Sequence, residues 1–84
     1  MKVQVRYFAS VREALGPGET MELETGARLS DLRDRLIARG GHHADALGRG
    51  RALRMAMNHA MVGDETQTVG EGAEIAFFPP VTGG

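Results

Sequence analysis

The residues whose types and spacing could do chemistry stand at the end of the sequence. It closes with Phe77-Phe78-Pro79-Pro80-Val81-Thr82-Gly83-Gly84. Each proline fixes its own φ and restricts the residue before it, so the run favours an extended segment. The two last glycines have no Cβ, so this tip could enter a channel too narrow for other residues. The α-carboxylate of Gly84 then becomes a group that could be adenylated with ATP and converted by a sulfur nucleophile to a thiocarboxylate.

The composition limits the other classes of function. The 84 residues are 42% hydrophobic and 25% charged, which is typical of one soluble globular domain. A net charge of −1 with no basic run argues against a nucleic-acid partner, and no stretch is apolar enough to suggest a membrane span. The absence of cysteine suits a cytoplasmic protein and excludes thiol catalysis. We interpret His42, His43 and His59 as exposed loop residues and expect no bound metal.

The apolar pattern predicts the elements that must position the C-terminal segment. Alternation predicts strands near residues 2–8, 20–24, 53–57, 60–62 and 74–78. Leu29, Leu32, Leu36 and Ile37 share one helical face, and Gly40-Gly41 should end that helix. Residues 10–15 can form a short helical turn. We interpret residues 42–51 as a loop with a helical turn near residues 44–47.

This order predicts an α+β fold in which a mixed sheet of about five strands packs over one main helix. The first and last strands should be parallel, because the connection between them passes through the helix. Residues 1–78 would form the domain and residues 79–84 an extended tail. Met55, Met57 and Met61 are interpreted as core residues.

A single helix covers one face of a sheet, so the other face should be open. Phe8 and Phe78 should lie on it, and exposed aromatic residues on adjacent strands would mark a surface for partner docking. A covering loop or a local bulge would bury them instead, and the alternation leaves both readings open. The side chains expected on this face are those of Gln4, Arg6, Phe8, Arg54, Ala56, Ala76 and Phe78.

Four segments together resemble a known family over nearly the whole chain. They are Val5-Arg6-Tyr7-Phe8-Ala9 with Val11-Arg12-Glu13, Leu29-Ser30-Asp31-Leu32, Met57-Asn58-His59 and residues 72–84. In these the chain resembles the small, sulfur-carrying subunits of molybdopterin synthase, often called MoaD, which have the ubiquitin-like β-grasp fold. The resemblance implies a carrier that binds no cofactor and is no enzyme on its own. An activating enzyme would adenylate Gly84 with ATP, and a sulfur donor would then convert it to the thiocarboxylate.

The resemblance also implies a partner and a substrate. Pro79, Pro80, Val81, Thr82 and Gly83 would insert into the active site of a large subunit, within a heterotetramer. Sulfur would pass there to cyclic pyranopterin monophosphate, and two rounds would build the dithiolene of the molybdenum cofactor.

Two other kinds of function remain open at this point. Related carriers serve thiazole synthesis or tRNA thiolation, or act as ubiquitin-like protein modifiers, and they share the Gly-Gly terminus. The Pro-Pro-Val-Thr segment before it favours the molybdopterin branch. A function of another class is a non-catalytic interaction module, in which the open sheet binds a protein and the tail is incidental.

Overall fold

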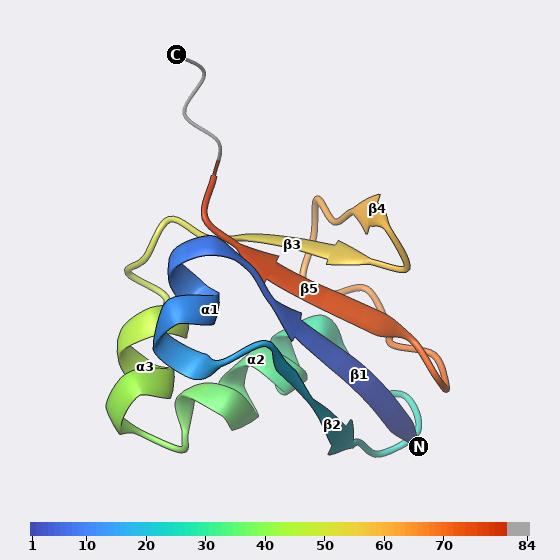
Figure 1. The fold of residues 1–84 in the computed structure, drawn as a ribbon. Helices are drawn as coiled ribbons and strands as arrows, with labels where there is room; N and C mark the ends of the chain where they lie inside the picture. Colours follow the sequence, from blue (N-terminus) through green and yellow to red (C-terminus); the bar gives the residue numbers. More distant parts are fainter. Residues whose placement is uncertain (81–84) are drawn as a thin grey trace.

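The computed structural model describes residues 1–80, so the predictions made for Val81, Thr82, Gly83 and Gly84 lie outside the described residues. Five strands form one sheet in the order β2-β1-β5-β3-β4 (Figure 1). Three helices complete the described fold. In chain order the elements are β1 (Lys2–Tyr7), α1 (Ala9–Leu15), β2 (Gly18–Glu22), α2 (Leu29–Ile37), α3 (Gly41–Leu47), β3 (Arg54–Met57), β4 (Ala60–Met61) and β5 (Glu74–Phe78).

The sheet confirms the predicted α+β class and the predicted direction of its central pair. β1 and β5 run parallel, while the three other pairs of neighbouring strands are antiparallel. Val3, Val5 and Tyr7 are fully buried and alternate with exposed residues along β1. Because side chains in a strand point to opposite faces in turn, this alternation leaves one sheet face on the core and one open.

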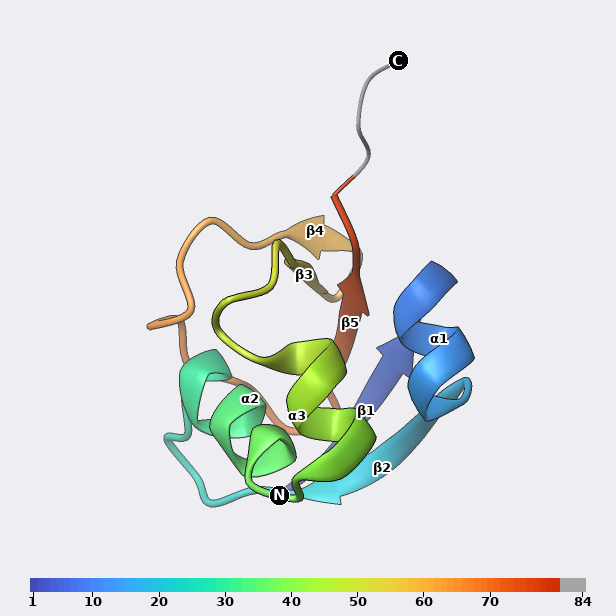
Figure 2. The same cartoon turned by 90° about the vertical axis from the view of Figure 1, so that its left-hand side faces the viewer.

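The helices differ from the prediction of one main helix. The predicted stripe on α2 is confirmed, because Leu29, Leu32 and Leu36 are fully buried against the sheet. Val11 of α1 and Leu47 of α3 join the same core cluster, so all three helices contribute to one core. α3 lies beside α2 (Figure 2). No helix within residues 1–80 is long and apolar enough to cross a membrane.

The interpretation of residues 42–51 as mainly loop was wrong for their first half. α2 already ends at Ile37, and Gly40, at a φ of +73°, caps the start of α3 instead of terminating α2. Residues 41–47 carry no clear apolar stripe, but Leu47 reaches the core and is fully buried. Tertiary burial of this one side chain therefore stabilises a helix that local propensity does not predict.

The predicted tight turn after β3 is confirmed. Asn58 and His59 both have positive φ, at 52° and 69°, as a two-residue hairpin turn requires. The Asn58 backbone N–H donates to the Glu74 carbonyl at 2.8 Å, and the Asn58 Oδ1 accepts from the Glu74 N–H at 3.0 Å. The turn is therefore fixed to β5.

One methionine lies where the sequence analysis did not expect it. Met55 is buried and Met57 packs partly buried against the core, as predicted. Met61 is 60% exposed, so its interpretation as a core residue was wrong. It pairs with Ala56 across the β3–β4 ladder and therefore shares the open face with it.

Candidate functional site

The open face of the sheet is the surface that the helices leave uncovered. Ala76 in β5 pairs with Arg6 on one side and with Ala56 on the other. Two residues further along β5, Phe78 pairs with Arg54. The inward neighbours of these residues are buried, which directs their own side chains outward.

Phe8 and Phe78 lie together on this face. They line a hollow of about 380 Å³ with Ala56, His59, Glu74 and Ala76, and we call it the aromatic hollow. Phe8 is 41% exposed, whereas Phe78 is half-buried. The structure thus brings the two aromatic residues into one apolar depression, and their role in docking a partner stays a prediction.

Phe8 is held at the junction between β1 and α1. Its N–H donates to the Phe77 carbonyl at 3.1 Å, and its own carbonyl accepts from the N–H groups of Val11 and Arg12. The next residue, Ala9, has a φ of +52°, a conformation that is uncommon for a residue with a side chain. These backbone contacts fix where the Phe8 ring leaves the sheet.

A row of polar side chains borders the aromatic hollow. Arg6 Nη1 lies 3.3 Å from Glu74 Oε1, and His59 Nε2 lies 3.0 Å from Glu74 Oε2. Glu74 therefore has a cationic or titratable partner on each carboxylate oxygen. Sequence reasoning missed this row because the hairpin turn and the parallel β1–β5 pairing bring together residues that are far apart in the chain.

The predicted tail begins directly after β5. Pro79 and Pro80 are half-buried and belong to no regular element. Pro79 also lines a second hollow of about 380 Å³, between α1, α3 and residues 51–53. The base of the segment thus lies between this hollow and the open face, and the role of Pro79 and Pro80 in insertion stays a prediction.

The histidines do not all lie in exposed loops. His59 is highly exposed, but His42 and His43 belong to α3. His43 is half-buried, and its Nε2 lies 3.7 Å from Glu19 Oε2. The described part of the chain holds no group of three His, Asp or Glu side chains arranged to bind a metal ion.

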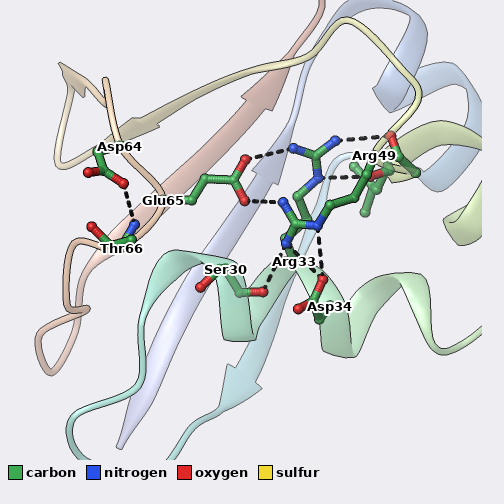
Figure 3. Close-up of polar contacts among 9 residues, drawn as sticks. Ser30, Arg33, Asp34, Arg49, Asp64, Glu65 and Thr66 are labelled. Atoms are coloured by element: carbon green, nitrogen blue, oxygen red, sulfur yellow. Dashed lines mark hydrogen bonds and ion pairs between the residues drawn. The ribbon is translucent and has the colours of Figure 1, made fainter.

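A buried arginine of α2, which the sequence analysis did not identify, connects this helix to the end of α3 and to the loop that follows β4 (Figure 3). Arg33 is 5% exposed and donates to the carbonyls of Leu47 and Gly48, while its Nη1 lies 2.8 Å from Glu65 Oε2. Arg49 holds the other Glu65 oxygen at 2.6 Å and pairs with Asp34 at 2.7 Å. Hydrogen bonds to Glu65 and Asp34 raise the pKa of the Arg49 guanidinium. Glu65 is therefore clamped between two arginines.

Comparison with known proteins agrees with this fold. The profile of the ThiS family matches residues 5–84. The chain is 38% identical over 82 residues to the molybdopterin synthase sulfur carrier subunit of Haemophilus influenzae, covering 98% of this chain and 99% of that protein. Two other curated proteins of the same name are 37% and 35% identical.

Solved structures show the same fold at lower sequence identity. SAMP1 from Haloferax volcanii superimposes with a TM-score of 0.78 at 22% identity, over the full length of both chains. A chain in the complex of subunits 1 and 2 of the molybdopterin-converting factor from Helicobacter pylori gives 0.73 at 24%, again over both full lengths. With the family profile covering almost the whole sequence and a ubiquitin-like sheet in the predicted strand directions, the chain belongs to the ThiS family.

Proposed function

We propose that this chain is the sulfur-carrier subunit of a molybdopterin synthase. The observation that carries the proposal is its 38% identity, over nearly the full length of both proteins, to a curated subunit of that name. The proposal includes a cytoplasmic location and a role without catalytic activity of its own.

The reactive group of the proposed carrier is the carboxylate of Gly84. In an activating enzyme, a carboxylate oxygen attacks the α-phosphorus of ATP and pyrophosphate leaves. A sulfur nucleophile from the donor then attacks the acyl adenylate, a C–S bond forms and AMP leaves. Since the chain has no cysteine, the sulfur is carried on the Gly84 carbonyl carbon and not on a side chain.

Two parts of the chain have different roles in delivering the sulfur. In this proposal residues 1–78 are the docking domain, and Pro79, Pro80, Val81, Thr82 and Gly83 carry Gly84 into the active site of a large subunit. That subunit supplies the acid–base catalysis for sulfur transfer to cyclic pyranopterin monophosphate. Two carriers and two large subunits form the heterotetramer.

The open face is the proposed docking surface. Phe8 and Phe78 supply apolar area around the aromatic hollow, and Phe78 directly precedes Pro79. A partner bound there is therefore adjacent to the start of the tail. Burial of apolar surface is the main favourable term in most protein association.

The intact mass of the protein tests the proposed chemistry. The chain is incubated with its activating enzyme, ATP and a sulfide source, and a mass gain equal to the exchange of one oxygen for sulfur is expected. Fragmentation should place the gain at Gly84. No gain with an activating enzyme that is active on another carrier would contradict the proposal.

Reconstitution separates the proposed branch from the related carriers. The thiocarboxylated chain should yield molybdopterin with the large subunit and the pterin precursor. Sulfuration of a thiazole precursor or of tRNA, without any molybdopterin, would assign the chain to another branch. Conjugation of the chain to protein amines would identify a modifier.

A further inference from the structure

Arg54 lies on the open face beside the aromatic hollow and at the base of the tail. It pairs with Phe78 in the β3–β5 ladder, and it is exposed. Cross-strand partners share a face of the sheet, so the side chains of Arg54 and Phe78 leave the sheet on the same face. The last strand residue before Pro79 thus has a cation as its neighbour.

The two acidic side chains that share a hollow with Arg54 both have other hydrogen-bonding partners. Arg54 lines a small hollow of about 180 Å³ together with Asp64 and Glu65. Both Glu65 oxygens are taken by Arg33 and Arg49, as Figure 3 shows. Asp64 Oδ1 accepts from the Thr66 N–H at 2.8 Å, and this contact lowers the pKa of the Asp64 carboxyl. Among the ion pairs within residues 1–80, none includes Arg54.

The charged and titratable side chains that border the aromatic hollow are paired with one another. Arg6 and His59 both lie against Glu74, at the side of the aromatic hollow away from the tail. The face therefore presents an apolar centre, a row of polar side chains that pair with one another, and the cation of Arg54 at the end where the tail begins. Lys2 is a second cation on this face, but it stands at the opposite end. A complementary protein surface has an apolar side chain for the hollow and a carboxylate for the cation.

We propose that Arg54 determines the specificity of the open face by pairing with a carboxylate of the molybdopterin synthase large subunit. This inference rests on the proposed function, because it takes the large subunit as the occupant of the face. The apolar hollow supplies area, which many partners could use, whereas the ion pair selects a partner with an acidic residue beside the entry of the tail.

Binding of charge variants to the large subunit from the same organism tests the inference. Dissociation constants are measured by calorimetry for the wild type, Arg54→Ala, Arg54→Lys and Arg54→Glu. Arg54→Ala should weaken binding about tenfold and Arg54→Glu about a hundredfold, while Arg54→Lys retains most of the affinity. Added salt should weaken wild-type binding more than it weakens binding of Arg54→Ala.

Lys2→Glu is the matched control. Lys2 is exposed on the same side of β1 as Gln4 and Arg6, but it stands at the opposite end of the sheet from the tail (Figure 1). The substitution changes the net charge by the same amount as Arg54→Glu. An effect below about threefold is expected, since a distant charge acts only through screened electrostatics. If Lys2→Glu and Arg54→Glu raised the dissociation constant by the same factor, the proposed local recognition by Arg54 would be overturned.

Other outcomes separate this inference from the function on which it depends. Unchanged binding of Arg54→Ala and Arg54→Glu, with a wild type that binds and carries sulfur, would overturn the inference alone. A wild type that neither binds the large subunit nor acquires sulfur would overturn the proposed function as well. Self-association of the free chain that is lost in Arg54→Glu, measured by analytical ultracentrifugation, would make a second copy the occupant and overturn the assignment to the large subunit.

Discussion

The Tyr7 hydroxyl donates a hydrogen bond of 2.9 Å to Glu19 Oε2 across the β1–β2 pair. Arg39 Nη1 approaches the other oxygen of the same carboxylate at 2.6 Å. Desolvation by burial opposes ionisation of Glu19, but the hydrogen bonds from Arg39 and Tyr7 outweigh it and hold the pKa of this carboxyl below its usual value. Glu19 therefore connects the sheet, through its ion pair with Arg39, to the segment between α2 and α3.

Tyr7 should make the protein sensitive to alkaline pH. Burial, followed by the hydrogen bond to Glu19 and its negative charge, raises the pKa of the Tyr7 phenol above its ordinary value of 10.0. The folded protein thus keeps the proton to higher pH than the unfolded chain does. The resulting stabilisation is fully present below pH 10.0 and declines as the pH rises further.

Tyr7 is the only tyrosine, so its ionisation can be followed by tyrosinate absorbance. The absorbance change should coincide with unfolding measured by circular dichroism. Tyr7→Phe should lower the free energy of unfolding at neutral pH by about 1 kcal/mol through the lost hydrogen bond. It should also flatten the decline above pH 10.0. Ionisation well before unfolding would contradict the assignment.

Arg33 and Arg49 should differ in their effect on stability although both bind Glu65. Arg33→Met leaves the carbonyls of Leu47 and Gly48 without this donor in a buried region and should cost about 3 kcal/mol. Arg49 has a 46% exposed side chain, so Arg49→Met should cost at most about 1 kcal/mol. Urea unfolding of the two variants makes the comparison. A larger loss for Arg49→Met would show that the exposed pair, and not the buried one, stabilises this region.

Phe78→Ala should weaken binding of the large subunit. Loss of one partly exposed aromatic face corresponds to about 2 kcal/mol of binding free energy. Phe8→Ala should act in the same direction, with little change in melting temperature because Phe8 is 41% exposed. An unchanged dissociation constant combined with a lower melting temperature would assign the aromatic residue to the core.

Deletion of Gly84 should separate docking from chemistry. The truncated chain should fold and still bind the large subunit, because the proposed docking contacts lie within residues 1–78. It should transfer no sulfur, since the activated carboxylate would stand one residue short. Gly84→Ala should reduce turnover more than stability, because a Cβ adds bulk at the tip. Full molybdopterin synthesis by the truncated chain would instead support an interaction module with an incidental tail.

Local patterns in the sequence determined the sheet and the main helix. Alternation in β1 predicted which side chains are buried, because strand side chains follow a period of two. The stripe of Leu29, Leu32 and Leu36 likewise predicted the buried face of α2. The order of the elements predicted the parallel pairing of β1 and β5. The segments that resemble the sulfur-carrier subunits indicated the family, which the profile match over residues 5–84 shows.

Only the tertiary structure decided which distant residues meet. α3 depends on burial of Leu47, and the exposed position of Met61 depends on its pairing with Ala56 at the sheet edge. The clamp on Glu65 and the isolation of Arg54 depend on loops that fold against α2 and β3. Periodicity reports which face of one element is apolar, whereas charge pairing depends on contacts between elements. The sequence therefore indicated the open face of the sheet and the terminal segment of the proposed carrier, but not the polar side chains that meet on that face.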